Sequence, residues 1–304
     1  MSNVSQHLFS GAVSGFTSGV CLQPFDLLKT RMQQGNGVTG EQKHLMTIVG
    51  TARQIIQTQG VLGLWRGTTP TILRNVPGVA MYFTGLNQVR TFMATSPYFA
   101  SVQSPQVNNN QHGSVLPKLS TSGNLAAGAI TRTAVGFVLN PFAVLKARFE
   151  SDLHAYSSLR GATLTLIRGG PSELFRGFVP SAFRDAPYAG LFVVFYESIK
   201  HDLTYIIPPS SAIFSTGIHG IAAASAGAIA TMATHPFDVV KTKMQVRSEY
   251  RYRSFFQTVL AISKDRGLPG FFDGAVLRLT RKIFSSAIGW AVYEGILILM
   301  RPPQ

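Results

Sequence analysis

The fold of this chain is decided by an eight-residue pattern that first occurs as Pro24-Phe25-Asp26-Leu27-Leu28-Lys29-Thr30-Arg31. The pattern returns as Pro141-Phe142-Ala143-Val144-Leu145-Lys146-Ala147-Arg148 and as Pro236-Phe237-Asp238-Val239-Val240-Lys241-Thr242-Lys243. At 43, 36 and 38 residues after the respective prolines, a glycine closes an aromatic-x-Gly triplet: Trp65-Arg66-Gly67, Phe175-Arg176-Gly177 and Phe272-Asp273-Gly274. Two linked patterns, repeated three times in the same order, indicate three related units.

The composition differs from that of an ordinary soluble domain. The 304 residues include 27 Lys and Arg against 13 Asp and Glu, a net charge of +14, yet only 13% of them are charged, whereas soluble domains average about 25%. The apolar fraction of 45% excludes a disordered chain, and the glycines show no collagen-like period. Residues 1–25 and 203–237 contain no Lys, Arg, Asp or Glu, which suits membrane spans.

Each unit has the same expected organisation. An apolar helix leads into the proline pattern, a polar stretch holds a short amphipathic helix, and a second apolar helix follows the triplet. We predict an all-α membrane protein with six transmembrane helices in three pseudo-symmetric two-helix repeats, at residues 4–96, 118–204 and 210–300. The uncharged stretches 75–89 and 186–196 are short, so a hydropathy scan should undercount these helices. The polar segment 97–117, rich in Ser, Pro and Asn, is predicted to be a flexible loop.

The basic residues predict the orientation of the repeats. Three long loops, 26–69, 143–180 and 238–275, hold 17 of the 27 basic residues. Basic loops stay on the side from which insertion is organised, so both termini should lie on the other side. The N-terminus has no basic region before its apolar run and no Arg-rich amphipathic signal, so we expect no cleaved presequence.

Several other functional classes fit the sequence poorly. The single cysteine, Cys21, gives no disulfide and no zinc cluster, and its apolar setting predicts a small buried hydrophobe. Neither a nucleophile-base set, a metal-ligand spacing nor a Gly-rich phosphate loop is present, so no enzyme, metal or cofactor is expected. A nucleic-acid-binding protein would explain the charge of +14, but it should cluster its basic residues on a polar domain instead of alternating them with apolar spans.

The triple proline pattern with its downstream aromatic-x-Gly triplet closely resembles the signature of the mitochondrial carrier family, over essentially the whole chain. The resemblance implies a three-fold pseudo-symmetric bundle in the mitochondrial inner membrane that alternates access around one central site. The termini would face the intermembrane space and the basic loops the matrix. It also implies a monomer and an anionic lipid partner, cardiolipin. The lipid would bind at the triplets through Arg66, Gly67, Arg176, Gly177 and Gly274.

The proline patterns predict a gate on the matrix side. A proline inside a helix removes a hydrogen bond and kinks it, and residues three apart, such as Asp26 and Lys29, share a helix face. An acid on one helix could then reach the base on the next; the alternative is ordinary helix-end charges in water or lipid headgroups. In the family arrangement Asp26 pairs with Lys146 and Asp238 with Lys29. Ala143 leaves Lys241 without its acid, so we expect a weak gate of two ion pairs.

The residues nine positions after each proline are Gln33, Glu150 and Gln245. The family uses a glutamine at this position to brace the ion pairs, and Glu150 departs from that pattern. The resemblance therefore assigns a bracing role to Gln33 and Gln245.

A second, cytoplasmic gate is expected 20 and 23 residues after each triplet glycine. The pairs there are Asn87 with Arg90, Glu197 with Lys200, and Glu294 with Leu297. Between neighbouring helices, only Glu294 and Arg90 form an acid–base pair. With a single ion pair this gate should be weak, which should favour opening to the cytoplasmic side. Exposed helix-end charges are the alternative interpretation.

Substrate contacts are expected from charges at membrane depth, where each costs about 2.5 to 3.5 kcal/mol and is a functional candidate. Arg74, Arg184 and Arg281 stand seven residues after each triplet glycine and match the family's three contact points. Asp185 follows Arg184 directly, so the pair could hold the carboxylate and the ammonium of a zwitterion. A local structural ion pair is the alternative. Arg132, nine residues before Pro141, could either compensate Asp185 or enlarge the carboxylate site.

Three runs are similar to those of the glycine-transporting branch of this family: residues 23–31, 73–83 and 184–190. The absence of an acid at Ala143 also fits that branch. The resemblance implies import of glycine into the matrix for the synthesis of 5-aminolevulinate and haem. Another small amino or keto acid is the alternative substrate.

Overall fold

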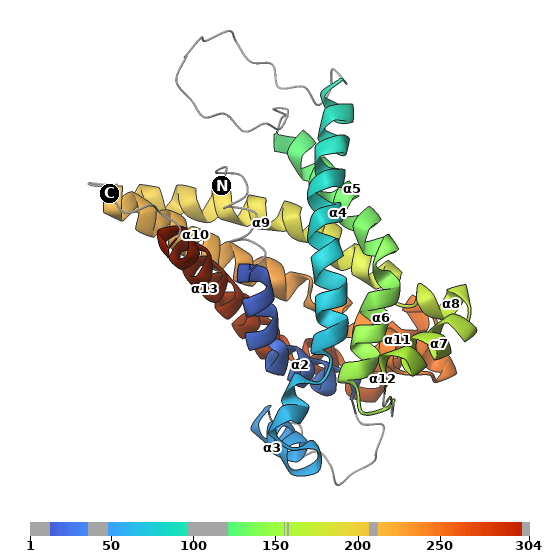
Figure 1. Cartoon of the computed structure of the whole chain (residues 1–304). Coiled ribbons are helices and arrows are strands. Elements are labelled where there is room, and N and C mark those ends of the chain that lie inside the picture. The colour runs from blue at the N-terminus through green and yellow to red at the C-terminus, as the bar shows by residue number, and fades with distance from the viewer. Residues whose placement is uncertain are drawn as a thin grey trace. The chain divides into compact units, whose positions relative to one another are not determined.

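The computed structural model describes residues 13–35, 48–95, 121–154, 156, 158–206 and 212–299 (Figure 1). Within these ranges every regular element is a helix, which confirms the all-α prediction. The predicted loop at 97–117 and both chain ends lie outside the described residues.

The helices follow one order three times. Residues 13–21 are helical and are followed by α2 (Gln23–Gln34), α3 (Ile48–Gln59), η2 (Val61–Trp65) and α4 (Thr68–Ala94). The second unit comprises α5 (Thr121–Val138), α6 (Asn140–Glu150), α7 (Leu159–Arg168), α8 (Pro171–Leu174) and α9 (Phe178–Ile206). The third comprises α10 (Ala212–Ala233), α11 (His235–Val246), η3 (Tyr250–Tyr252), α12 (Phe255–Arg266), η4 (Leu268–Phe272) and α13 (Ala275–Leu299).

The signature prolines break their helices as predicted. A single non-helical residue, Leu22, Leu139 or Thr234, interrupts the helix two positions before each proline. Proline has no N–H to donate to the carbonyl four residues earlier. For Pro24 that carbonyl belongs to Val20, and it accepts a hydrogen bond from the Trp65 indole Nε1 at 3.0 Å. The aromatic residue of the first triplet thus supplies the donor that the proline lacks.

Each helix that follows a signature proline packs on the short amphipathic helix of its own repeat. The two apolar residues three and four positions after the proline are buried in all three copies, and each pair forms a cluster with α3, α7 or α12. The clusters are Leu27, Leu28, Ile55 and Leu277; Val144, Leu145, Ala162 and Leu166; and Val239, Val240, Met244 and Ile262. Burying one such side chain contributes about 1.5 to 3 kcal/mol, so each cluster fixes its motif helix locally.

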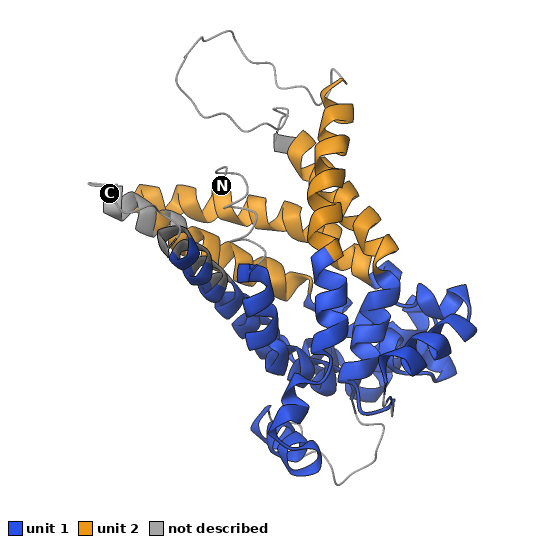
Figure 2. Ribbon diagram, in the orientation of Figure 1, with its two compact units in different colours: residues 1–76, 140–180, 235–304 blue, residues 77–139, 181–234 orange. Residues whose placement is uncertain are grey.

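The compact units of the chain do not coincide with the sequence repeats (Figure 2). One unit contains residues 1–76, 140–180 and 235–304, and the other contains 77–139 and 181–234. We call them unit 1 and unit 2. All three signature patterns and all three triplets fall in unit 1. Unit 2 has its own buried cluster of Leu86, Met93 and Ala127.

By length and hydropathy, none of the described helices could cross a membrane by itself. The consecutive helices Gly123–Val138 and Asn140–Glu150 meet that criterion together. The six expected spans therefore stay a prediction.

Apolar side chains are nevertheless exposed along the long helices. On α4, Leu73, Val76, Val79 and Phe83 are 43%, 64%, 57% and 63% exposed, and their spacing places them along one helix face. Cys21 is exposed as well, so the prediction of a buried cysteine was wrong. An apolar stripe of this kind marks a surface that contacts lipid or another protein.

Candidate functional site

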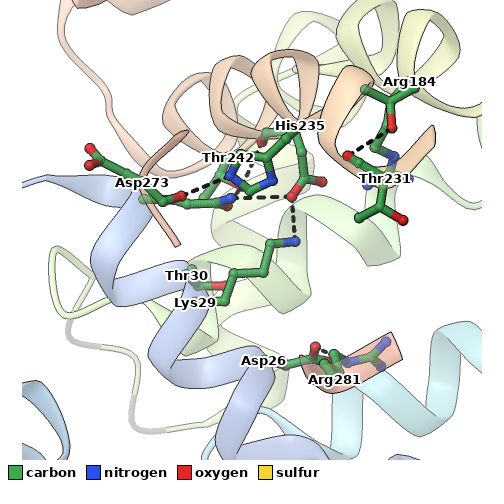
Figure 3. A network of polar contacts seen from close by, with 12 residues as sticks. Asp26, Lys29, Thr30, Arg184, Thr231, His235, Thr242, Asp273 and Arg281 are labelled. Carbon is green, nitrogen blue, oxygen red and sulfur yellow. Dashed lines mark hydrogen bonds and ion pairs between the residues drawn. The ribbon is translucent and has the colours of Figure 1, made fainter. Parts of the chain in front are cut away.

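The first and third signature acids are held by lysines of the next copy along the ring of motif helices. Lys29 Nζ lies 2.5 Å from Asp238 Oδ2, and Lys146 Nζ lies 2.6 Å from Asp26 Oδ2. Both carboxylates are at least nine-tenths buried. Figure 3 shows the Lys29 side chain extending from α2 to its carboxylate partner. These are the two ion pairs expected from the motifs, and we call them the signature ion pairs.

Arg281 joins this network instead of standing apart from it. Its guanidinium, carried by α13, forms an ion pair with Oδ1 of Asp26, as Figure 3 shows. Asp26 is therefore shared by two cations, Lys146 and Arg281. Position 143, where a third acid would pair with Lys241, holds the buried Ala143.

Two of the three side chains nine positions after the signature prolines, Gln33 and Glu150, stand beside the signature ion pairs. Gln33 Nε2 donates to Asp238 Oδ2 at 3.2 Å, and Gln33 Oε1 accepts from Thr242 Oγ1 at 2.6 Å. Gln245 Nε2 instead donates to the carbonyl of Arg176 at 3.4 Å. Of the two expected braces, Gln33 contacts an ion pair in this structure, whereas Gln245 binds backbone.

The triplet glycines have no side chain, which lets the side chains nine positions after the prolines pack directly against the triplet backbone. A Cβ on Gly67 would lie 2.9 Å from Glu150 Cγ, and one on Gly177 would lie 2.8 Å from Gln245 Cγ. Both glycines also have a positive φ, 93° and 73°, which side-chain-bearing residues rarely adopt. A Cβ on the third triplet glycine, Gly274, would lie 3.5 Å from Gln33 Cγ, an ordinary van der Waals distance. The two linked sequence patterns thus meet in space, each triplet against the motif helix of the next copy.

Motif arginines form a second layer of contacts that the sequence did not reveal. Arg31 Nε donates to the carbonyl of Glu150 at 2.7 Å, and Arg148 Nε donates to that of Gln245 at 3.1 Å. In the third copy a lysine, Lys243, stands at the equivalent position. Arg247, four residues further on, donates from Nε to the carbonyl of Gln34 at 2.8 Å and from Nη2 to that of Gly35. We call Arg31, Arg148 and Arg247 the guanidinium ring.

The guanidinium ring ties the last turn of each motif helix to the next. Carbonyls in a last helical turn have no partner within the helix, and cations are favoured there. The basic residue seven positions after each proline was a usable signal for Arg31 and Arg148. The position of Arg247 one helical turn later could not be read from the motif.

The arginines of the first two triplets, Arg66 and Arg176, bind other groups of the protein. Arg66 Nη2 donates to the carbonyls of His154 and Tyr156 at 3.3 and 3.4 Å. Arg176 is buried and binds Glu173 at 2.8 Å, a carboxylate that it shares with Arg148. Lipid binding at the triplets stays a prediction. Because Arg66 and Arg176 make these contacts within the protein, a bound lipid would rely mainly on the backbone of the triplet glycines.

Two side chains of the segment 143–180, His154 and Glu173, have shifted pKa values. Burial and the nearby charges of Arg148 and Arg176 lower the pKa of His154 to about 4. Burial opposes ionisation of Glu173, but the hydrogen bond from Arg148 and the charge of Arg176 outweigh it and lower the pKa of that carboxyl. His154 is therefore neutral and Glu173 ionised at neutral pH.

In unit 2, Arg184 and Asp185 bind each other. Arg184 Nε lies 2.8 Å from Asp185 Oδ1, and Nη2 lies 3.0 Å from Oδ2. The two hydrogen bonds form a bidentate pair on α9, with side chains that are 17% and 24% exposed. This is the local ion pair that the sequence left open as an alternative.

The remaining predicted substrate contacts are divided between the units. Arg132, on α5 of unit 2, places its guanidinium carbon 5.5 Å from the centre of the Tyr82 ring, a cation–π contact. Arg74 is half-buried on α4 and belongs to unit 1, as Arg281 does. Both interpretations of Arg132 stay predictions.

Among the residues of the predicted cytoplasmic gate, Glu197 is exposed and Lys200 is half-buried. Glu197 and Lys200 face each other along α9 at 4.0 Å, with side chains 63% and 37% exposed. Arg90 is half-buried, and the side chain of Glu294 lies outside the described residues. The exposure of Glu197 fits the alternative of an exposed helix-end charge, and the cytoplasmic gate stays a prediction.

Comparison with known proteins gives a consistent result over the whole chain. The profile of the family described as "Mitochondrial carrier protein" matches residues 1–97, 117–205 and 214–302. A protein of Laccaria bicolor named "Mitochondrial glycine transporter" is 61% identical over 306 residues, covering 99% of each chain. Proteins with the same name from Aspergillus fumigatus and Emericella nidulans are 40% and 41% identical. Each alignment covers 98% of this chain, and 93% and 89% of the relatives.

Proposed function

Because the chain belongs to the mitochondrial carrier family, we propose that it is a transporter of the mitochondrial inner membrane that carries glycine into the matrix. The observation that carries the proposal is full-length similarity, at 61% identity, to a protein named as a mitochondrial glycine transporter. The protein is accordingly a carrier and not an enzyme.

The Arg184–Asp185 pair offers a chemically suitable site for glycine. The two side chains satisfy each other's charge through two hydrogen bonds. A zwitterion can insert between them, its carboxylate on Arg184 and its ammonium on Asp185, so that one ion pair is exchanged for two. A keto acid has no ammonium group and would leave Asp185 unmatched, which favours an amino acid as substrate.

Alternating access requires that the two ends of the path open in turn. The signature ion pairs, Lys29 with Asp238 and Lys146 with Asp26, are closed in this structure. Opening toward the matrix would break them, and the energy of substrate binding would offset that cost. With Ala143 in place of an acid, the motifs supply two such pairs instead of three.

Further parts of the proposal concern the setting of the carrier. The termini face the intermembrane space, the basic loops face the matrix, and the exposed apolar stripe of α4 contacts lipid tails. The carrier acts as a monomer, with cardiolipin at the triplet glycines. The imported glycine supplies the synthesis of 5-aminolevulinate and haem.

Uptake by the purified protein in liposomes tests the function directly. We expect saturable uptake of labelled glycine that protein-free liposomes lack. Unlabelled alanine, serine and a small keto acid serve as competitors. Uptake of one of these solutes without glycine uptake would overturn the substrate assignment and leave the carrier family intact.

A further inference from the structure

Glu150 places a carboxylate where the other two copies of the motif place glutamines, Gln33 and Gln245. The Glu150 side chain is 3% exposed. A buried carboxylate is costly unless it is paired, or neutralised by a proton. In the second copy, the residue nine positions after the proline is therefore titratable, and it lies beside the Asp26–Lys146 ion pair.

Glu150 competes with Asp26 for the same cation. Lys146 Nζ lies 2.6 Å from Asp26 Oδ2 and 3.5 Å from Glu150 Oε1. Two carboxylates that share one ammonium group repel each other, and a proton on one of them relieves the repulsion. The charged groups at the site come from three helices: Lys146 on α6, Asp26 and Arg31 on α2, and Arg281 on α13, which reaches the site through Asp26.

The hydrogen-bond partners of Glu150 accommodate both protonation states. Gln23 Nε2 donates to Oε1 at 3.0 Å, and Thr30 Oγ1 lies 2.7 Å from Oε2. A threonine hydroxyl can donate to a carboxylate or accept from a carboxylic acid. Thr242 makes the equivalent contact to Gln33 at 2.6 Å.

Protonated Glu150 would also resemble the glutamine that it replaces. Gln33 donates to the acid of its ion pair, Asp238, at 3.2 Å. An ionised carboxylate can only accept hydrogen bonds, whereas a protonated one can donate a single bond. The proton thus decides whether Glu150 can donate a hydrogen bond to the acid of its ion pair, as Gln33 does.

We propose that Glu150 is a proton-binding site beside the signature ion pairs, and that glycine transport by this chain depends on matrix-side pH through it. The inference rests on the proposed function. The closed network buries Glu150 and favours its protonated form, whereas opening admits water and favours ionisation. High pH on the matrix side therefore promotes opening, and low pH keeps the network closed.

Glu150→Gln is the decisive variant because it installs the residue of the other two copies. The protein is reconstituted with its matrix side facing inward, and initial glycine uptake is measured at internal pH 5.5 to 8 with a fixed external pH. The wild-type rate should rise with internal pH, by at most about tenfold per pH unit for one proton. The rate of Glu150→Gln should be flat.

Asp152→Asn is a matched control, since it removes a carboxylate two residues away that binds Arg31 at 2.8 Å. Its pH dependence should follow the wild type. The inference is overturned if Glu150→Gln keeps the wild-type pH dependence, or if Asp152→Asn loses it to the same extent.

Thermal unfolding in detergent gives a readout that does not require glycine transport. If the folded protein binds the Glu150 proton more tightly than the unfolded chain does, the proton stabilises the fold at low pH. This stabilisation is lost as the pH rises. The unfolding temperature of Glu150→Gln should therefore rise relative to that of the wild type between pH 5 and pH 8. Parallel midpoints across this range would overturn the inference, whereas absent glycine uptake with diverging midpoints would contradict only the proposed function.

Discussion

Arg281 on α13 pairs with Asp26 on α2, so the first signature acid binds two cations at once, Lys146 being the other. The sequence places Arg281 among the substrate contacts, by its distance from the triplet glycine. The substrate role stays a prediction, whereas the structure shows the charge of Arg281 engaged by the acid that also binds Lys146 of the second copy. Substrate and signature ion pairs could therefore compete for one guanidinium.

A double-mutant cycle of Asp26→Asn and Arg281→Gln measures this relationship. We expect a coupling free energy of about 1 to 3 kcal/mol, since both residues belong to one ion-pair network. Unfolding of the four proteins in detergent gives the value. Additive effects of the two substitutions would show that the pair contributes nothing to stability.

Arg184→Gln and Asp185→Asn should each reduce glycine uptake by about tenfold or more, because a charged hydrogen-bond partner is worth about 1.5 to 3 kcal/mol. Proteoliposome uptake of glycine is the measurement. Asp202→Asn is the control, as Asp202 is an exposed acid on the same helix. Wild-type uptake by either of the first two variants would contradict their assignment to the substrate.

Arg247→Ala should lower the free energy of unfolding by about 2 kcal/mol, because it removes the third member of the guanidinium ring from two carbonyls. Lys243→Arg, introduced into that variant, should restore part of the loss, since an arginine at this position makes the contact in the other two copies. Thermal unfolding compares the three proteins. Failure of the second substitution to rescue would mean that the copies are not equivalent here.

Gly67→Ala should destabilise the protein more than Gly60→Ala. Both glycines have a positive φ, 93° and 73°, so both substitutions strain the backbone. Only at Gly67 would the new Cβ meet another helix, 2.9 Å from Glu150, while nothing lies within 4 Å at Gly60. The difference between the two unfolding midpoints measures the close approach, and equal midpoints would show that Glu150 moves aside freely.

His154 should make the protein less stable in acid. Its folded pKa of about 4 lies below the ordinary value of 6.5, so the unfolded chain binds the proton first. Stability is complete above about pH 6.5 and falls as the pH drops toward 4. His154→Gln should flatten this part of the pH–stability curve, and an unchanged curve would assign the acid sensitivity to other groups.

Local features of the structure followed from the sequence. Each signature proline breaks its helix, and the two apolar residues that follow, such as Leu27 and Leu28, are buried against the amphipathic helix of the same repeat. The two signature ion pairs also agree with the motif and the family arrangement. The roles of these residues in gating and substrate binding stay predictions.

Other contacts could not be predicted because several partners lay within reach of each long side chain. Arg176 could have bound lipid, but it is buried against Glu173. Arg184 could have been open toward a substrate, but its guanidinium folds back onto Asp185. The motif spacing fixes where such a side chain starts, and it does not fix which carboxylate the guanidinium meets.

The sequence by itself determined the three repeats, the helix breaks and the position of every motif charge, because a missing N–H and an apolar period act within a few residues. Only the tertiary structure decided that Arg281 shares Asp26, that Arg247 completes the guanidinium ring, and that Asp26 approaches the Lys146–Glu150 pair of α6. Those contacts depend on how the helices approach one another, because a hydrogen bond forms only when donor and acceptor come within about 3.2 Å.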